Sequence, residues 1–363
     1  MAKRVGVDKW LFGTVIMLVL FGLVMVFSAS AIMAQAKYNS PYTFVVKQAG
    51  WAVLGLGALT MLMQVDYRKY NRPKVVFPAV AITMVLLLVV FAFHDSHHTH
   101  RWIRFGGFFT FQPSEIAKPT LVLFLAWFLQ DKVQHMQDWK RVLLPAVAPS
   151  LLFIALILKQ PDLGTGLVCA GVTALMLYLA GMQMRYFGVG AVAAAPVLIY
   201  MLSVPWRRAR IMAFLNPGSD PQGSGFHINQ SLIAVSTGGF RGLGLMEGRQ
   251  KLFFLPEAHT DFIFANIAEE LGLLGAIALV GLFVVLGYRG LRTAVLSTDP
   301  FARFLAFGIT ATIMIQAFFN ISVTLSLLPT KGITLPFISS GGTSLFIMLA
   351  SIGVLLNISR EVD

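Results

Sequence analysis

The chain has 363 residues, of which 57% are hydrophobic and only 12% are charged. Soluble domains carry about 25% charged residues, roughly twice this fraction, so the composition excludes an ordinary soluble protein. It predicts an all-α protein that crosses a membrane many times. The formal net charge of +12 indicates either basic cytoplasmic loops or a binding site for an anionic partner. No pattern in the sequence indicates that this partner is a nucleic acid.

About ten segments are apolar and long enough to be membrane-spanning helices, which need about 20 mostly apolar residues. In chain order they are 10–32, 44–65, 75–93, 114–130, 142–159, 163–181, 186–204, 262–288, 302–325 and 343–358. We expect one transmembrane domain over residues 1–363. Its one long extramembrane segment is an outer loop at 205–261, between the seventh and eighth spans.

The first span has an alternative reading as a cleaved signal peptide. Lys3 and Arg4 precede an apolar run that ends in the small residues 28–31. The apolar core of a signal peptide is about 7–15 residues long, and this run is longer. We therefore interpret the segment as the first membrane span.

Basic residues orient the predicted bundle, because cytoplasmic loops of membrane proteins are enriched in Lys and Arg. With the N-terminus inside, every inner segment carries basic residues, whereas the short outer loop 33–43 holds only Lys37. Both termini are therefore predicted to be cytoplasmic. The remaining outer basic residues include Arg101, Arg104, Arg207, Arg210 and Lys331. They predict an anionic partner such as a phosphate or pyrophosphate, with anchoring to lipid headgroups as the alternative.

The fourth span begins with a polar sequence that is unusual for a membrane helix. Pro113 suits the first helical turn, and Gln112 or Ser114 could cap it. Glu115 and Lys118 are three residues apart and would share one helix face. In apolar surroundings such residues form a structural ion pair more often than a direct ligand site.

Asp162 follows Pro161 at the start of the sixth span. An acid at a helix N-terminus interacts favourably with the helix dipole, so Asp162 is either a plain cap or part of the site. In the loop 205–261, many glycines would let backbone amides approach a ligand, which alone is weak evidence. Gln230 and Ser231 lie in this loop, in a short helical or re-entrant piece.

The mouth of the eighth span is the most suggestive segment. It carries three ionisable residues: Glu257, His259 and Asp261. Such residues at a membrane boundary are costly and are functional candidates. Thr260 is expected to cap the span and to place Asp261 in its first turn. Glu269 and Glu270 lie deeper and must face protein or water, as a proton relay or as a structural pair.

Two further groups could be metal ligands. Five outer residues form a histidine-rich run that could bind zinc: His94, Asp95, His97, His98 and His100. The only cysteine, Cys169, lies within an apolar run and is better read as a small core residue. A single cysteine also excludes an internal disulfide.

Five segments carry a family resemblance: RWIRFGGFFTFQPSEIAK (101–118), KQPDLGTG (159–166), FLNPGSDPQGSGFHINQSLIAVSTGG (214–239), LPEAHTDFIFANIAEELG (255–272) and LPTKGITLPFISSGGTSL (328–345). They resemble, in order and almost end to end, the signatures of the SEDS membrane proteins, the RodA/FtsW/SpoVE family. Segments 256–259 and 329–332 look more like the division branch than the elongation branch. Ser340 and Thr343 depart from residues common in the family, Tyr and Ser, which puts in doubt any role of an aromatic hydroxyl there.

The resemblance implies a peptidoglycan glycosyltransferase that polymerises lipid II on the outer face of the cytoplasmic membrane. It implies a class B penicillin-binding protein, a transpeptidase, as partner, with other divisome or elongasome membrane proteins. Asp261 takes the place of the family's essential acid. The residues expected to bind substrate are Arg101, Arg104, Glu115, Lys118, Asp162, Arg207, Arg210, Gln230, Ser231, Glu257, His259, Lys331, Ser339 and Gly341.

The residues assign no cofactor with certainty, although a divalent cation, magnesium or manganese, could help the basic residues to hold a pyrophosphate. Three alternatives have the same topology. The chain could be a lipid II flippase, a noncatalytic scaffold that recruits the transpeptidase, or another lipid-linked sugar transferase such as a glycan ligase. Within the family, an elongation polymerase of the RodA type is the alternative to a septal enzyme.

Overall fold

Each predicted span coincides with a helix in the computed structural model, which describes residues 6–93, 101–105, 109–133, 138–216, 223 and 225–361. The helices at the predicted spans are α1 (Lys9–Tyr38), α2 (Thr43–Gln64), α3 (Pro73–Val89), α4 (Pro113–Leu129), α5 (Leu144–Lys159), α6 (Leu163–Leu179), α7 (Met184–Ser203), α10 (Ile263–Leu296), α11 (Pro300–Thr324) and α12 (Gly342–Ser359). The all-α membrane fold is thus confirmed.

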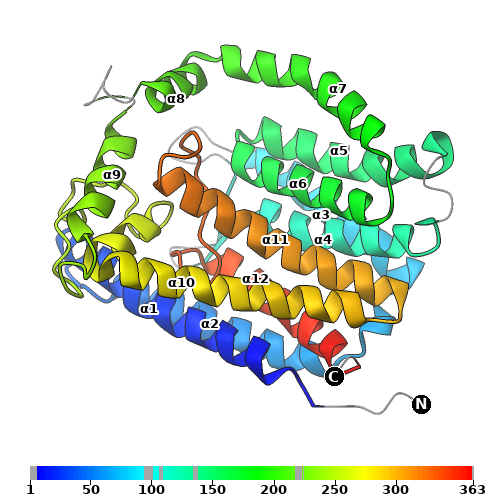
Figure 1. Cartoon of the computed structure of the whole chain (residues 1–363), viewed down its shortest axis with the longest axis horizontal. Coiled ribbons are helices and arrows are strands. Elements are labelled where there is room, and N and C mark those ends of the chain that lie inside the picture. The colour runs from blue at the N-terminus through cyan, green and yellow to red at the C-terminus, as the bar shows by residue number, and fades with distance from the viewer. Residues whose placement is uncertain are drawn as a thin grey trace.

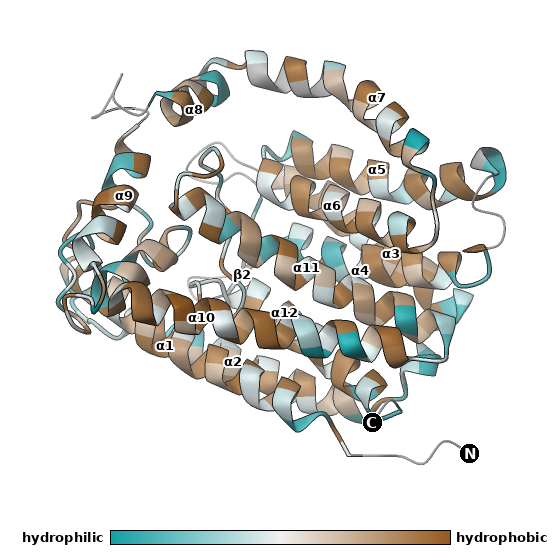
Figure 2. Ribbon diagram, in the orientation of Figure 1, coloured by the Kyte–Doolittle hydropathy of each residue, from teal (hydrophilic) through white to brown (hydrophobic). Residues whose placement is uncertain are grey.

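Length and hydropathy alone identify seven helices of the described chain as long and apolar enough to cross a membrane. They are α1, α2, α3, α5, α10, α11 and α12, with α3 and α5 extended by adjoining short helical turns. α6 is apolar but shorter. The protein is therefore a multi-pass membrane protein, and the count of ten spans stays a prediction. Brown, hydrophobic residues cover most of the bundle helices in Figure 2.

The predicted outer loop 205–261 contains two helices, α8 (Pro205–Leu215) and α9 (Phe226–Gly238), followed by a series of turns. The piece with Gln230 and Ser231 is helical, as the sequence indicated. α7 and α8 arch over one side of the bundle, and α9 leads back toward the start of α10 (Figure 1). Within the described ranges the only strands are β1 (Ile103–Phe105) and β2 (Phe109–Phe111), which form an antiparallel hairpin before α4.

Proline and aspartate mark the starts of many of the helices. Proline occupies the first turn of α3, α4, α5, α8 and α11, where its missing N–H costs no hydrogen bond. Asp8, Asp162 and Asp299 cap α1, α6 and α11 by accepting backbone N–H bonds. Gln112 occupies the N-cap position of α4, but its side chain makes no capping bond.

The predicted cap of the eighth span is wrong. α10 begins at Ile263, and Thr260 donates its hydroxyl to the Glu257 side chain at 2.9 Å instead of capping the helix. Asp261 consequently lies in a turn ahead of the helix and not in its first turn. A cap hydroxyl accepts a backbone N–H at the helix start, and Thr260 lies three residues before the first residue of α10, with Phe262 at the N-cap position.

Close backbone approaches hold the bundle together. A Cβ at Gly353 of α12 would lie 2.6 Å from the Leu59 carbonyl oxygen of α2, so the two helices touch at their backbones. Gly272 has φ 65° and kinks α10, and its backbone packs against Gly242 of the turn segment. Only glycine adopts this conformation readily and leaves room for such contact.

Gly353→Val should destabilise the protein by about 1–3 kcal/mol, because overpacking forces α2 and α12 apart. Gly57→Val is the matched control, since Gly57 lies within α2 and a Cβ there meets nothing within 4 Å. Thermal unfolding in detergent measures both variants. Equal melting temperatures for the two would contradict the close α2–α12 contact.

Candidate active site

A cavity of about 700 Å³ opens where several helices begin. Its lining combines the first turns of α4, α6 and α12 with Asp261 just before α10 and with the segment 329–334. The predicted site residues that line it are Arg101, Glu115, Lys118, Asp162, Arg207, Arg210, Glu257, Asp261, Lys331 and Gly341. The structure therefore brings most of the predicted residues together, although they are distant in sequence.

Five predicted residues lie outside this lining. Ser231 is buried and donates its hydroxyl to the Thr324 carbonyl at 2.8 Å. Gln230 lines a separate groove on α9. His259 is buried against the ring of Phe44, and Ser339 is buried behind the cavity wall. Arg104 lies in β1 with its backbone opposite Thr110.

Asp261 is the acid that the geometry singles out. It is half-buried in the cavity wall, and its carboxylate accepts no hydrogen bond from the part of the chain that the structure describes. Burial, and next the charge of Glu257, raises the pKa of Asp261 to about 7, while Arg101 and Arg210 oppose the shift. A carboxyl group titrating near neutrality is suited to accept a proton from a substrate.

Four basic residues, Arg101, Arg207, Arg210 and Lys331, line the same cavity and make it suitable for an anion. Burial together with the charges of Arg207 and Arg210 lowers the pKa of Lys331 to about 8. The helices α4, α6 and α12 also direct their positive dipole ends toward the cavity. Arginines and helix N-termini are the groups that hold phosphates in many proteins.

The arginine nearest to α6 is held by backbone. Arg101 donates to the carbonyl oxygens of Gln160 and Pro161, the residues that precede the α6 cap. Asp162 in turn accepts from the Thr165 N–H at 3.1 Å and the Thr165 hydroxyl at 2.9 Å. The cap reading of Asp162 is thus confirmed, and Asp162 also lines the cavity.

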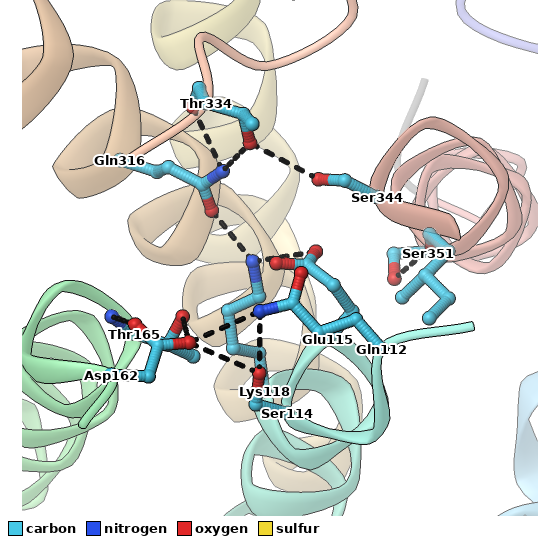
Figure 3. Close-up of polar contacts among 11 residues, drawn as sticks. Gln112, Ser114, Glu115, Lys118, Asp162, Thr165, Gln316, Thr334, Ser344 and Ser351 are labelled. Atoms are coloured by element: carbon cyan, nitrogen blue, oxygen red, sulfur yellow. Dashed lines mark hydrogen bonds and ion pairs between the residues drawn. The ribbon is translucent and has the colours of Figure 1, made fainter. Parts of the chain in front are cut away.

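A chain of polar side chains runs along the inner wall of the cavity (Figure 3). Lys118 forms an ion pair with Glu115 at 2.8 Å and donates to Gln316 at 2.7 Å. Gln316 donates to the carbonyl and hydroxyl oxygens of Thr334. The predicted ion pair within α4 is thus confirmed, and both of its members are almost fully buried. The hydrogen bond from Lys118 to Gln316 joins α4 to α11.

Glu269 and Glu270 form a structural pair. Glu270 accepts from Lys251 at 2.7 Å, from the Ser28 hydroxyl and from the Met246 N–H. Glu269 accepts the backbone N–H groups of residues 249 and 250. Both acids therefore fasten the turn segment that leads to Asp261 onto the kinked start of α10.

Sequence reasoning missed several polar residues of the site. Gln316 and Asn320 lie within the ninth predicted span, where the cost of a buried amide in apolar surroundings was the available signal. Gln112, Thr334 and Ser344 also line the cavity. Their positions follow from tertiary packing and had no sequence signal of their own.

No group of three or more His, Cys, Asp or Glu residues suited to a metal ion occurs among the residues that the structure describes. The proposed zinc run at 94–100 falls outside those residues. Cys169 is buried in the core, as expected for a small packing residue. The cavity acids could still contact a cation that arrives with a pyrophosphate.

Comparison with known proteins adds independent information. The model of a family described as cell cycle protein, FtsW/RodA/SpoVE, matches residues 8–363. A Geobacter metallireducens protein named "Probable peptidoglycan glycosyltransferase FtsW" is 44% identical, covering 94% of this chain and 92% of that protein. Stage V sporulation protein E of Bacillus subtilis is 40% identical, with 99% and 98% coverage.

Two solved structures share the fold. The rod shape determining protein RodA of Thermus thermophilus aligns with a TM-score of 0.72 at 26% identity, covering 98% of this chain and 97% of that chain. A chain from a peptidoglycan synthase complex that coordinates polymerization and crosslinking aligns with a TM-score of 0.79 at 28% identity. This second alignment covers 98% of this chain and 99% of the other.

Lys118→Met should destabilise the protein by about 3–5 kcal/mol, because it leaves the buried Glu115 carboxylate without its partner. The double variant Glu115→Gln, Lys118→Met removes both charges and should recover part of that loss. Thermal unfolding in detergent compares the two. A double variant no more stable than Lys118→Met alone would show that the unpartnered charge of Glu115 is not the cause of the loss.

Proposed function

The chain belongs to the family of cell cycle proteins that contains FtsW, RodA and SpoVE, and we propose that it polymerises lipid II with Asp261 as the catalytic base. It is a peptidoglycan glycosyltransferase and a multi-pass membrane protein. The single observation that carries the proposed mechanism is the half-buried Asp261, which has a pKa of about 7 and whose carboxylate accepts no hydrogen bond from a described residue, in a cavity lined by basic residues.

The chemistry explains why one acid is enough. A glycosidase normally needs two carboxylates, because a sugar oxygen leaves poorly without protonation. A pyrophosphate is a good leaving group, so one base and a set of cations are sufficient. Asp261 takes the proton from the 4-hydroxyl of the acceptor sugar as that oxygen attacks the anomeric carbon of the donor. The bond to pyrophosphate breaks with inversion, which gives a β-1,4 link.

The cations of the cavity have the complementary role. Arg101, Arg207, Arg210 and Lys331 hold the pyrophosphate and stabilise the charge that develops on it. Their charges also lower the cost of keeping Asp261 ionised, since Arg101 and Arg210 both favour its deprotonated form. A divalent cation, magnesium or manganese, could share the pyrophosphate oxygens, and no protein residue is assigned to it.

The site is on the outer face of the cytoplasmic membrane in this proposal. The opposite end of the bundle holds both chain ends and is rich in basic residues, as expected of a cytoplasmic side. Ion pairs fasten that end: Asp8 with Arg289 at 2.6 Å, and Arg68 with Glu361 at 2.8 Å. The cavity lies where α4, α6, α10 and α12 begin, so all four enter the membrane from the same face.

The partner that we propose is a class B penicillin-binding protein, which supplies the transpeptidase. The likeness to a chain of a peptidoglycan synthase complex supports this assignment. Sequence identity to FtsW proteins, at up to 44%, supports septal synthesis within the divisome, with elongation as the alternative. A scaffold without activity would have no use for an acid with a raised pKa in a cationic cavity.

Asp261→Asn should lower the rate of lipid II polymerisation by about 10²–10⁴-fold, the usual contribution of a general base. The measurement is glycan-strand synthesis from purified lipid II in detergent, with the partner present. Since detergent leaves no membrane to cross, activity of the wild type also separates a polymerase from a flippase. Wild-type rates for Asp261→Asn would remove Asp261 from the mechanism.

The rate should rise with pH through an apparent pKa near 7, because only the deprotonated carboxylate accepts a proton. Glu257→Gln removes a negative charge that raises the pKa of Asp261, so it should move this rise to lower pH. Arg101→Gln removes a charge that lowers the same pKa, so it should move the rise to higher pH. Initial rates across the pH range test both, and shifts in the same direction would contradict the electrostatic assignment.

A further inference from the structure

The backbone around Asp261 belongs to no helix or strand, yet it is held at three consecutive residues. Asp261 follows a series of turns and precedes α10. The carbonyl of His259 accepts from the Ser340 N–H at 2.9 Å, and that of Thr260 accepts from the Ser339 hydroxyl at 2.6 Å. A segment outside regular structure needs such bonds to hold a side chain in one place.

The third bond comes from a different element. Asn320 of α11 donates its amide to the Asp261 carbonyl at 2.8 Å. The same amide nitrogen donates to the Ile333 carbonyl at 2.6 Å. Asn320 is 1% exposed and does not line the cavity, so it has no direct access to substrate.

Ile333 belongs to the short segment that carries Lys331 and Gly332. A Cβ placed on Gly332 would lie 2.8 Å from a carboxylate oxygen of Asp261, so this backbone passes directly beside the acid. Lys331 lines the same cavity. One amide group therefore joins the segment of the acid to the segment of a cation.

We propose that Asn320 is a positioning residue that fixes Asp261 relative to Lys331. The inference rests on the proposed function, in which Asp261 accepts the proton and Lys331 holds the pyrophosphate. A glycosyl transfer needs the base on the attacking oxygen and the cation on the leaving oxygens at the same moment. Misplacement by about 1 Å can cost about 10²-fold in rate, so a shared anchor for both groups has a direct catalytic consequence.

The side-chain chemistry at position 320 is specific. The two hydrogens of an amide nitrogen satisfy two carbonyl oxygens at once, which also fixes the orientation of the amide. Leucine has nearly the same shape and no donor, so it would leave both carbonyls unpaired. Aspartate would place negative oxygens against the two carbonyls.

The test is Asn320→Leu in the lipid II polymerisation assay, with the partner present and rates expressed per folded molecule. We expect kcat to fall by about 10–100-fold with little change in KM. The rise of rate with pH should also move to lower pH, because a loosened Asp261 is better hydrated and burial is the main cause of its raised pKa. A residue needed only for folding would reduce the folded fraction and leave kcat and the pH profile of the folded molecules unchanged.

The matched control is Thr310→Val, which removes a buried hydrogen bond of the same helix, from the Thr310 hydroxyl to the Ala306 carbonyl. It should retain the wild-type rate and pH profile. If Asn320→Leu does not fold, Ser339→Ala removes one donor to the same segment and should give a smaller loss with the same shift in pH. Ser339→Thr, which keeps the hydroxyl, should restore the rate.

The outcomes separate this inference from the proposed function. If Asp261→Asn is inactive while folded Asn320→Leu has the kcat and pH profile of the wild type, the positioning role of Asn320 is wrong. The assignment of Asp261 as the base is then still supported. The same holds if Ser339→Ala, used in its place, has a wild-type rate and pH profile. If Asp261→Asn polymerises lipid II at the wild-type rate, both assignments are wrong.

Discussion

The structure depends on the high cost of an unpaired charge inside an apolar bundle. Lys118 with Glu115, Lys251 with Glu270 and Arg289 with Asp8 each form an ion pair in which at least one member is almost fully buried. Breaking such pairs is costly, because the remaining member would be left as a buried charge without its partner. Against this background Asp261 is the exception, because its carboxylate accepts no hydrogen bond from any described residue. Burial, and next the charge of Glu257, raises the pKa of Asp261.

Part of the positive potential in the cavity comes from the direction in which its helices run. Alternate helices of the bundle must start at the same face, so the positive dipole ends of α4, α6 and α12 converge on the cavity. The side chains of α8 and of segment 329–334 add cations to these dipoles. An anion is therefore stabilised by the topology itself and by local side chains together. This combination suits a pyrophosphate that gains charge as its bond to the sugar breaks.

Much of this architecture follows from sequence and some of it does not. Hydropathy located the helices, and spacing along one helix was enough to pair Glu115 with Lys118, because helical geometry is local. The predicted cap by Thr260 was wrong because α10 begins only at Ile263, with Phe262 at the N-cap position, and sequence patterns do not fix helix boundaries to within a residue or two. The hydrogen bonds of Ser339 and Asn320 could not be predicted from the sequence, because their acceptors at residues 260 and 261 lie 79 and 59 positions away. Only the packing of α11 and the segment before α12 brings them together.

The support of Asp261 comes from both sides of its turn segment. At one side, Glu269 and Glu270 bind the backbone and lysine of residues 246–251 to the start of α10. At the other, α11 and residues 339–340 hold three consecutive carbonyls. A base placed within a helix would move with that helix alone. Asp261 lies instead in a turn that adjoins α10, and Asn320 of α11 ties its carbonyl and that of Ile333, in the segment of Lys331, to one amide group. In the proposed mechanism, the irregular backbone at this point therefore joins the position of the base to the position of the cation that holds the leaving group.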